Sequence, residues 1–441
     1  MTATTQGFSL KNKLLTEFEL QKTGLLLENP LLDNFRSGAA KAFSETGFPT
    51  KRIEDYKYLR FEKLERADLS VPFTPEKLEA NAVIEGKLIP DNAIHIKLIN
   101  GFPDLKGLDK EEISKNLEIV SLGEAIRSNN KHVLSLLGTL VKPSSDSFAA
   151  LNSAMFMDGV FIRIKENYQA DRPLFISEIN DSSQGAFSQN RILFLAEPNS
   201  EISVFHHQSN ASLSNVAFAN TVIEAELEKS SRVKWTCIQE ENPSSMHITN
   251  SGIHIYTEAV LTHIMVSLSG GLIRNNTSMI MEEARAEGHL LGYYHPKGDE
   301  TIDNHTVADH RKPHCNSNEL YKGVVDGKGT AVFNGKIFVQ KDAQKTNAFQ
   351  SNKNILLSEG STVNTKPQLE IYADDVKCSH GSSTGLFDAD QIFYLRARGL
   401  SLKSARKLLL KAYTEEVFDK IPDEKVKDYL ELRIESLIEQ E

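Results

Sequence analysis

The sequence predicts a mainly β protein, in which a core of many short strands lies between two helical regions. Between residues 158 and about 377, short apolar or alternating segments are separated by polar turns, and almost no segment sustains a helical pattern. Apolar residues recur at helical spacing before about residue 60 and again after about residue 386. We therefore divide the chain into an N-terminal helical or α+β region over 1–155, a β core over 156–385 and a C-terminal helical domain over 386–441.

Length and composition exclude several classes of protein. A chain of 441 residues exceeds the size at which single cores usually stop growing, so we expect more than one domain. No run approaches the roughly 18 apolar residues of a membrane-spanning helix, and the net charge of −10 disfavours nucleic acid as a partner. Three widely spaced cysteines argue against a disulfide framework or a zinc ribbon. Because the first twenty residues lack an apolar signal core and include Glu17 and Glu19, we expect a cytoplasmic protein.

The N-terminal region is predicted to be helical as far as about residue 59. Apolar residues at 14, 18, 25–27 and 31–32 keep helical spacing, with breaks at Asn29-Pro30 and at Gly47-Phe48-Pro49. Beyond residue 70 the pattern is mixed. Residues 94–99 alternate like a strand, and residues 124–140 have the pattern of an amphipathic helix. This stretch therefore indicates α+β structure.

The β core contains strands that are too short to bury a face alone. Examples lie at 160–164, 192–195, 222–227, 233–238, 253–256, 261–266, 279–281, 331–333, 337–339, 355–357 and 369–372. Coils stacked on one another would give such strands a shared core, as in a parallel β-helix. The later strands begin about 15 to 20 residues apart, which suits two strands per coil. A β-sandwich fits the same pattern, and periodicity alone does not separate the two folds.

Two helices are predicted at the C-terminal end. Ser401 can cap the first, whose apolar stripe comprises Ala405, Leu408, Leu409, Ala412, Tyr413 and Val417. Pro422 ends this helix, and a second from about Asp423 carries Val426, Leu430, Ile434, Leu437 and Ile438. A two-helix tail beside a solenoid is poorly placed to bury both stripes on its own core. We therefore expect one stripe to be available to a partner.

The segment over residues 373–385 is the clearest candidate for chemistry. If it is extended, Cys378 and His380 lie on one face of the strand, because alternate side chains share a face. A nearby cation such as Lys377 lowers the pKa of a thiol, and thiolate and imidazole are ligands for soft or borderline metals. The alternative is that Cys378 only packs, because lone cysteines are often buried.

Other apparent motifs are weaker. Residues 323–330 are similar to a phosphate-binding loop, but have too few residues between the glycines and lack the Ser or Thr that should follow the lysine. We therefore identify no nucleotide-binding motif and no sign of a self-contained enzyme in this sequence. Between His295 and Cys315 lie His305, His310 and His314, whose types suit iron or zinc but whose spacing matches no zinc template. We interpret this run as structural, through hydrogen bonds between neighbouring coils.

Short motifs between residues 319 and 400 occur in one order that resembles a known family. They lie at 321–323, 332–337, 343–347, 354–358, 367–371, 375–380 and 393–399, and a further motif lies at 47–58. In this order they resemble the SufB/SufD family of iron–sulfur cluster assembly proteins. The segment 375–380 is similar to the SufD branch, whereas the SufB branch has acidic and hydroxyl residues there. The family usually has tryptophan where Tyr56 stands.

The resemblance implies a fold and a set of partners. The family core is a right-handed parallel β-helix, which favours the solenoid over the sandwich. It also implies a non-catalytic scaffold that pairs with a SufB paralogue near the last coils and docks the ATPase SufC on its C-terminal helices. The residues predicted to meet the ATPase are Arg398, Ala405, Leu408, Leu409, Ala412 and Val417.

For the site, the resemblance places Cys378 and His380 at the SufB interface, where a nascent iron–sulfur cluster forms. We expect these two residues to be its ligands. We expect no permanently bound cofactor, only this transient cluster. The sequence leaves open whether a flavin binds the assembled complex, and whether the chain forms a homodimer when SufB is absent.

The same part of the sequence also suits a different class of function. Parallel β-helices also occur in polysaccharide-active enzymes, which use carboxylates and basic residues in a groove. Here Glu370, Asp374, Asp375 and Lys377 would be the candidates. Such enzymes are commonly secreted and this chain has no evident signal peptide, so we rank the scaffold first.

Overall fold

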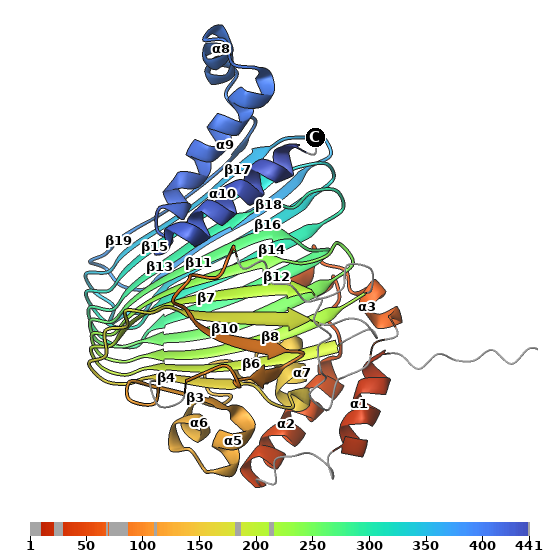
Figure 1. Cartoon of the computed structure of the whole chain (residues 1–441), viewed down its shortest axis with the longest axis vertical. Coiled ribbons are helices and arrows are strands. Elements are labelled where there is room, and N and C mark those ends of the chain that lie inside the picture. Colours follow the sequence, from red (N-terminus) through yellow and green to blue (C-terminus); the bar gives the residue numbers. More distant parts are fainter. Residues whose placement is uncertain are drawn as a thin grey trace, which may run out of the picture.

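The computed structural model describes residues 10–21, 30–67, 69, 87–109, 113–180, 187–210 and 216–439. Two large sheets run the length of the molecule and the chain passes alternately from one to the other (Figure 1). The nine-stranded sheet contains β3 (Leu117–Ser121), β4 (Val160–Ile164), β6 (Phe187–Ala196), β8 (Phe218–Leu227), β10 (Met246–Ile255), β12 (Leu272–Met281), β14 (Thr301–His310), β16 (Thr330–Val339) and β18 (Thr362–Ile371). The ten-stranded sheet contains β1 (Ile94–Ile99), β2 (Phe102–Asp104), β5 (Leu174–Asn180), β7 (Glu201–Asn210), β9 (Arg232–Glu240), β11 (Val260–Ser269), β13 (Glu287–Tyr294), β15 (Asn316–Val325), β17 (Asn347–Leu356) and β19 (Lys377–Gly385).

Every strand pairing from β4 to β19 is parallel, so the core is a parallel β-solenoid with one strand of each sheet per coil. The predicted mainly β fold with flanking helices is thereby confirmed. The β-sandwich alternative is wrong, because its sheets would be antiparallel. Strands β13 to β19 begin at residues 287, 301, 316, 330, 347, 362 and 377, slightly closer together than the sequence indicated.

One corner of the coil repeats the same backbone conformation from β4 to β17. A single residue with positive φ stands between each even-numbered strand and the next odd-numbered one in this range, namely Asn167, Asn199, Ser230, Glu258, Arg285, His314 and Lys345, whereas the turn between β18 and β19 has none. Each turn also hydrogen-bonds to the next, as when the backbone N–H of His314 donates to the carbonyl of Gln344 over 2.9 Å. Stacking of these turns keeps the coils in register.

The first coil is sealed by residues that precede it. β1 pairs with β5, β3 pairs with β4, and side chains of Ile113 and Leu117 join the interior core. The strand predicted at 94–99 is confirmed. The single helix predicted over 124–140 is wrong: two short helices, α5 (Leu122–Arg127) and α6 (Lys131–Leu136), stand there. Asn129 has φ of 53° and Asn130 caps α6 through its side chain, so the two asparagines interrupt the helix.

The N-terminal helices cover the outer face of the nine-stranded sheet near this sealed end. They are α1 (Leu10–Gln21), α2 (Pro30–Thr46), the 3₁₀ turn η1 (Glu54–Tyr56), α3 (Glu62–Arg66) and α7 (Ser147–Met155). Pro30 begins α2, and Gly47 ends it with φ of 63°, as proline and glycine commonly do. The predicted helical residues 25–27 lie outside the described part of the chain.

The C-terminal helices are α8 (Ala389–Ala397), α9 (Leu402–Phe418) and α10 (Glu424–Glu439). The Ser401 hydroxyl caps α9, as predicted, by accepting from the backbone N–H of Ser404. Leu410, Val417 and Phe418 of α9 and Val426, Leu430 and Ile434 of α10 all pack on the outer face of the ten-stranded sheet. The predicted α9 stripe is divided: Ala405 and Val417 are buried, whereas Leu408 and Ala412 are exposed. The expectation that one stripe stays free is therefore confirmed only in part. The side chains of Leu437 and Ile438 in the α10 stripe lie outside the described part of the chain.

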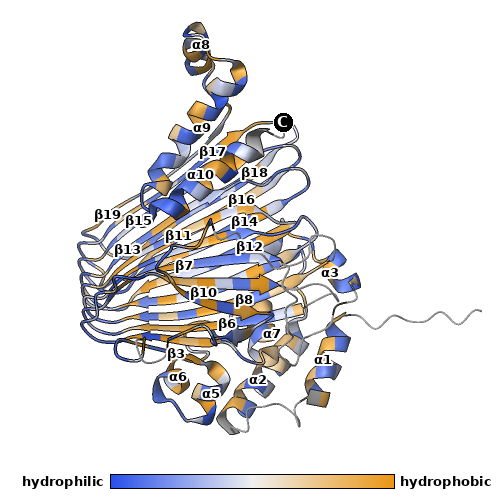
Figure 2. Cartoon of the chain, in the orientation of Figure 1, coloured by the Kyte–Doolittle hydropathy of each residue, from blue (hydrophilic) through white to orange (hydrophobic). Residues whose placement is uncertain are grey.

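Hydrophobic and hydrophilic residues alternate along many strands, while α8 stands clear of both sheets (Figures 1 and 2). No residue of α8 is buried. Over the residues described, none of the helices has the length and apolar character needed to cross a bilayer.

Candidate functional site

The last coil leaves the solenoid open at one end. Among the described residues, β18 pairs only with β16 and β19 only with β17, so each carries an edge without a strand partner there. Both strands are long, and nearly all their side chains are half-buried or exposed. An uncovered edge of this kind is a template for pairing with another chain. We call the end formed by β18 and β19 the open end.

Cys378 and His380 lie together on the inward face of β19, as the alternation predicted. Cys378 stands in register with Ala348 of β17 and packs partly against the interior core, whereas His380 is exposed. Burial raises the pKa of the Cys378 thiol, although a backbone hydrogen bond from Ala348 works in the opposite direction. The expectation of a thiol pKa lowered by Lys377 is therefore wrong for the uncovered chain. The imidazole of His380 is therefore more accessible than the thiol of Cys378.

Polar side chains continue this inward face below the open end. Gln350, Asn352 and Asn354 of β17 are buried directly beneath His380, Ser382 and Thr384. The amide of Asn352 donates to the hydroxyl of Tyr294 over 2.8 Å, and that hydroxyl donates to Asn354 over 2.7 Å. The coil below the open end therefore has a hydrogen-bonded polar interior.

Further along the interior, the polar residues surround a buried glutamate. Glu178 accepts hydrogen bonds from Asn190, Thr221 and Gln208, and contacts the imidazole of His206 over 2.9 Å. Burial alone would raise the pKa of Glu178, but His206 and the other donors hold it at about 2. The strand alternation could not reveal these residues, because it assigns polar side chains to the solvent side.

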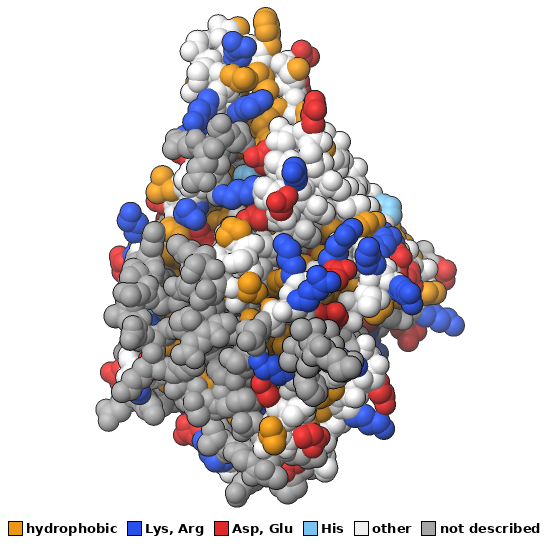
Figure 3. All heavy atoms as spheres, turned by 90° about the vertical axis from the view of Figure 1, so that its right-hand side faces the viewer, with side chains coloured by type: hydrophobic (Ala, Val, Ile, Leu, Met, Phe, Trp, Pro, Cys, Tyr) orange, Lys and Arg blue, Asp and Glu red, His pale blue; other side chains and the backbone are white. Residues whose placement is uncertain are grey.

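The six residues predicted to meet an ATPase fall into two groups. Arg398 is exposed and lies over the ring of Tyr394, Leu408 is 48% exposed, Ala412 is exposed and Leu409 is half-buried. Ala405 and Val417 are fully buried by the chain itself. Several apolar side chains that the prediction omitted are exposed nearby, among them Leu386 at 75% and Phe393 at 74%. Figure 3 shows hydrophobic side chains at the surface at the top of the view, where α8 lies.

The histidine-rich run does not gather into a metal site. His310 is buried with its Nε2 2.8 Å from the Ser317 hydroxyl, and burial lowers its pKa to about 4. His314 occupies one of the positive-φ corners, and the Cys315 thiol donates to the carbonyl of Glu283 over 3.2 Å. No cluster of three or more His, Cys, Asp or Glu side chains suited to a metal occurs among the described residues. These contacts favour the structural interpretation of the run.

The four residues considered for a polysaccharide-active enzyme either form ion pairs or are exposed to solvent. Glu370 pairs with Lys336 at 2.6 Å, and Asp375 pairs with Lys345. Asp374 and Lys377 are exposed. Nothing in this arrangement singles out an acid and base aimed at one substrate.

The early motif over 47–58 contacts the solenoid. The ring of Tyr56 is buried beneath the guanidinium of Arg274 on β12, 4.0 Å from its centroid, and Arg274 pairs with Asp303 at 2.8 Å. Glu54 reaches Lys366 on β18 at 3.2 Å. The motif therefore ties the N-terminal region to the nine-stranded sheet, as far as its last strand.

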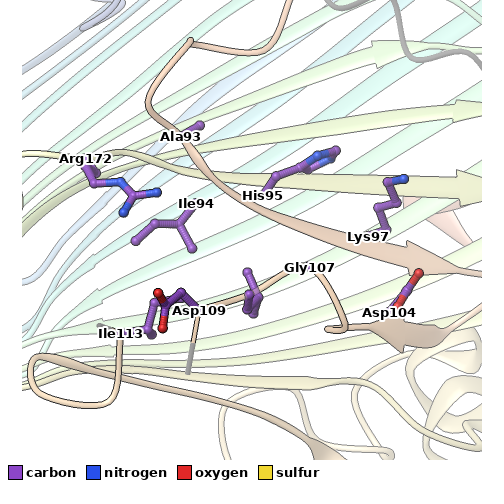
Figure 4. Close-up of a pocket in the computed structure, with 10 residues that line it drawn as sticks. Ala93, Ile94, His95, Lys97, Asp104, Gly107, Asp109, Ile113 and Arg172 are labelled. Carbon is purple, nitrogen blue, oxygen red and sulfur yellow. The ribbon is translucent and has the colours of Figure 1, made fainter. Parts of the chain in front are cut away.

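A pocket of about 340 Å³ lies beside β1, at the far end of the ten-stranded sheet from β19 (Figure 4). Its lining carries both signs of charge, from Lys97 and Arg172 on one hand and Asp104 and Asp109 on the other. His95 also lines it. Burial lowers the pKa of His95 to about 4, and its Nε2 lies 2.7 Å from the Ser177 hydroxyl. This pocket is remote from Cys378 and His380.

Comparison with known proteins identifies the family. The family model for the SUF-system SufBD core domain matches residues 178–413, and the model for the SufBD N-terminal region matches residues 11–176. A SufBD-family iron–sulfur cluster assembly protein of Synechocystis is 30% identical, over 90% of this chain and 88% of its own length. Escherichia coli SufD is 28% identical over 88% and 89%, and the chloroplast protein ABCI7 of Arabidopsis thaliana is 25% identical over 92% and 86%. The chain is a member of the SufBD family of iron–sulfur cluster assembly proteins.

Proposed function

We propose that this chain is a non-catalytic scaffold that assembles iron–sulfur clusters at its open end, covered by a paralogue of the SufB type. The observation that carries the proposal is the position of Cys378 and His380, which face inward together on a strand with one unpaired edge. Sulfur and imidazole nitrogen are suited to iron. A second, like-folded solenoid laid on β18 and β19 would satisfy the unpaired backbone groups and close the space in front of both side chains.

The C-terminal helices supply the second docking surface in this proposal. α8 has no buried residue, and Leu386, Phe393 and Tyr394 expose large apolar areas there. Exposing large apolar side chains to water is unfavourable, and a contiguous patch of them commonly marks a protein interface. We assign this patch, with Arg398 and Leu408, to an ATPase of the SufC type. Such a subunit would supply energy from ATP hydrolysis, since we identify no nucleotide-binding motif in this chain. Cytoplasmic residence and the division into three regions remain predictions.

Co-expression with both partners tests the proposal. The wild-type chain should retain the paralogue and the ATPase through purification, and the complex should hold iron and acid-labile sulfide after anaerobic reconstitution. His380→Ala should keep both partners and lose most of the iron and sulfide, because it removes a proposed ligand whose side chain is exposed rather than packed in the core. Phe393→Asp should lose the ATPase and keep the paralogue.

Thr384→Ala provides a matched control for the first variant, since it changes an exposed residue on the same face of β19. It should leave partners and cluster content unchanged. Full iron and sulfide in the His380→Ala complex would remove the ligand role. A Phe393→Asp chain that still retains the ATPase would remove the docking role of α8.

A further inference from the structure

Two buried residues, Gln350 and Glu319, lie beneath His380, and the role that we infer for them rests on the function proposed above. Gln350 is the register neighbour of His380 on β17, and Glu319 is the neighbour of Gln350 on β15. Gln350 and Glu319 are 3% and 2% exposed. Adjacent strands in a sheet lie about 4.8 Å apart, so the three side chains form one column along the inward face.

The Gln350 amide is held in one orientation. Its Nε2 donates to a carboxylate oxygen of Glu319 in a short hydrogen bond. The amide oxygen therefore points elsewhere, and within the described part of the chain Oε1 of Gln350 has no hydrogen-bond partner. A buried acceptor without a partner is costly, so such atoms in native proteins usually have a use.

The space for this amide is built into the opposite sheet. A Cβ placed on Gly335 of β16 would stand 2.4 Å from Nε2 and 2.9 Å from Cδ of Gln350. Any side chain at residue 335 would therefore displace the amide. Gly335 belongs to the 332–337 motif noted in the sequence. The close contact with Gln350 explains why a residue without a side chain is needed at this position.

Glu319 is suited to fix the amide because it forms no ion pair with any of the described residues. Burial raises its pKa to about 7, and the hydrogen bond from Gln350 opposes that rise. The carboxyl group thus stays in the interior as a hydrogen-bond acceptor for the amide, rather than as half of an ion pair.

We propose that Glu319 and Gln350 are positioning residues for His380: Glu319 orients the Gln350 amide, and Gln350 Oε1 accepts the N–H of the His380 ring when a partner covers the open end. A metal-ligating histidine commonly donates its second ring N–H to such an acceptor, which fixes the tautomer and aims the other nitrogen at the metal. In the uncovered chain the His380 ring is exposed, so this bond forms on assembly. Neither residue is itself a ligand.

Variants that differ in hydrogen bonding but not in size test the column in the purified three-component complex. Gln350→Met and Glu319→Met should each lower the iron and sulfide content about tenfold at limiting iron, the usual effect of losing an outer partner of a ligand. Glu319→Gln should restore most of the content, because its amide oxygen can accept the same bond. Gln368→Met, an amide lost from the outward face of β18, is the matched control and should have no effect.

A spectroscopic readout separates positioning from general damage. Pulsed electron paramagnetic resonance of the reduced cluster should show the hyperfine signal of a ligating imidazole nitrogen in the wild-type complex, and this signal should be weakened or lost in Gln350→Met. Co-purification of both partners and an unchanged melting temperature show that the variant is assembled. If Gln350→Met does not assemble, the Glu319→Met and Glu319→Gln pair decides.

The outcomes also separate this inference from the proposed function. Full cluster content and an unchanged nitrogen signal in Gln350→Met or in both Glu319 variants, with loss in His380→Ala, would overturn the column and leave the proposed function standing. Equal losses in Glu319→Gln and Glu319→Met would overturn the orienting role of Glu319. Full content in His380→Ala would defeat the proposed function itself.

Discussion

The two ends of the solenoid differ in how they treat the backbone edge that a terminal coil exposes. At the first coil, the short strands β2 and β3 pair antiparallel with their neighbours, and residues between them fill the interior. At the last coil, β18 and β19 are nine or ten residues long and parallel, and leave polar side chains exposed. Short edges resist further pairing, whereas long regular edges invite it. The last coil therefore keeps two long edges suited to further pairing, which the first coil lacks.

Two ion pairs, one from each part of the solenoid, differ strongly in burial. Near the sealed end, Arg191 of β6 and Glu224 of β8 form a fully buried pair at 2.5 Å. Glu224 also accepts backbone N–H groups of Gly138, Leu140 and Val141, which holds the loop before α7 on the sheet. Near the open end, Lys336 and Glu370 form a pair that is partly exposed to water.

The largest effect on stability is expected from breaking the buried pair. Glu224→Gln should lower the free energy of unfolding by about 3–5 kcal/mol, because the Arg191 charge would stay buried without its counter-charge. Urea denaturation followed by circular dichroism measures this. Glu370→Gln is the matched change at the open end and should leave the midpoint unchanged. Similar midpoints for both variants would break the comparison, since they would show that the sealed end is no better packed.

A pH effect is the next in size, and arises from histidines inside the solenoid. Burial lowers the pKa of His263 to about 4, with a smaller contribution from His206 nearby. Its unfolded pKa is about 6.5, so between these values the unfolded chain binds the additional proton. Stability should therefore fall as pH falls through this window, by about 2 kcal/mol at pH 5 for this residue.

The variant His263→Gln should make the dependence of unfolding free energy on pH shallower between about pH 6.5 and 4. Ser267→Ala is the control, because it removes a buried hydrogen bond to Gln239 in the same interior without removing a titrating group. It should lower stability by a similar amount at every pH in the window. A His263→Gln slope equal to that of the wild type would show that His263 does not resist protonation in the folded chain.

Features of the fold that depend on local sequence patterns could be predicted, and features that depend on packing between distant residues could not. Local sequence patterns located the strand segments, the Ser401 cap and the shared face of Cys378 and His380, and the structure confirms these positions. The predicted strand lengths were wrong, since the segments given separately at 331–333 and 337–339 belong to the single strand β16. The buried face of α9 did not follow. Its Leu410 and Phe418 face the sheet while Leu408 is exposed, and a helix with apolar residues on several sides does not reveal which side meets the core.

The polar interior was also beyond prediction from periodicity. Glu178, Glu319 and Gln350 lie inside, although alternation assigns such side chains to solvent. Only the stacking of coils, which is a long-range feature, gives them partners. A local sign did exist, in the inward glycines: Gly335 makes room for Gln350, and Gly323 makes room for Asn354 and Tyr294. A glycine within a strand indicates a close approach of this kind.

The smallest effect is expected at the positive-φ corners, which recur from β4 to β17 and are absent from the turn between β18 and β19 at the open end. His314 has φ of 64°, a conformation that costs a side-chain-bearing residue about 1–2 kcal/mol relative to its ordinary one. His314→Gly should therefore raise the free energy of unfolding by about 0.5–1 kcal/mol, after the greater entropy lost by glycine on folding is set against that gain. His289→Gly, within strand β13, should instead lower it by about the same amount. A destabilised His314→Gly chain would contradict this prediction. It would show that the His314 imidazole makes a stabilising bond at that corner, to another residue or to a bound ligand.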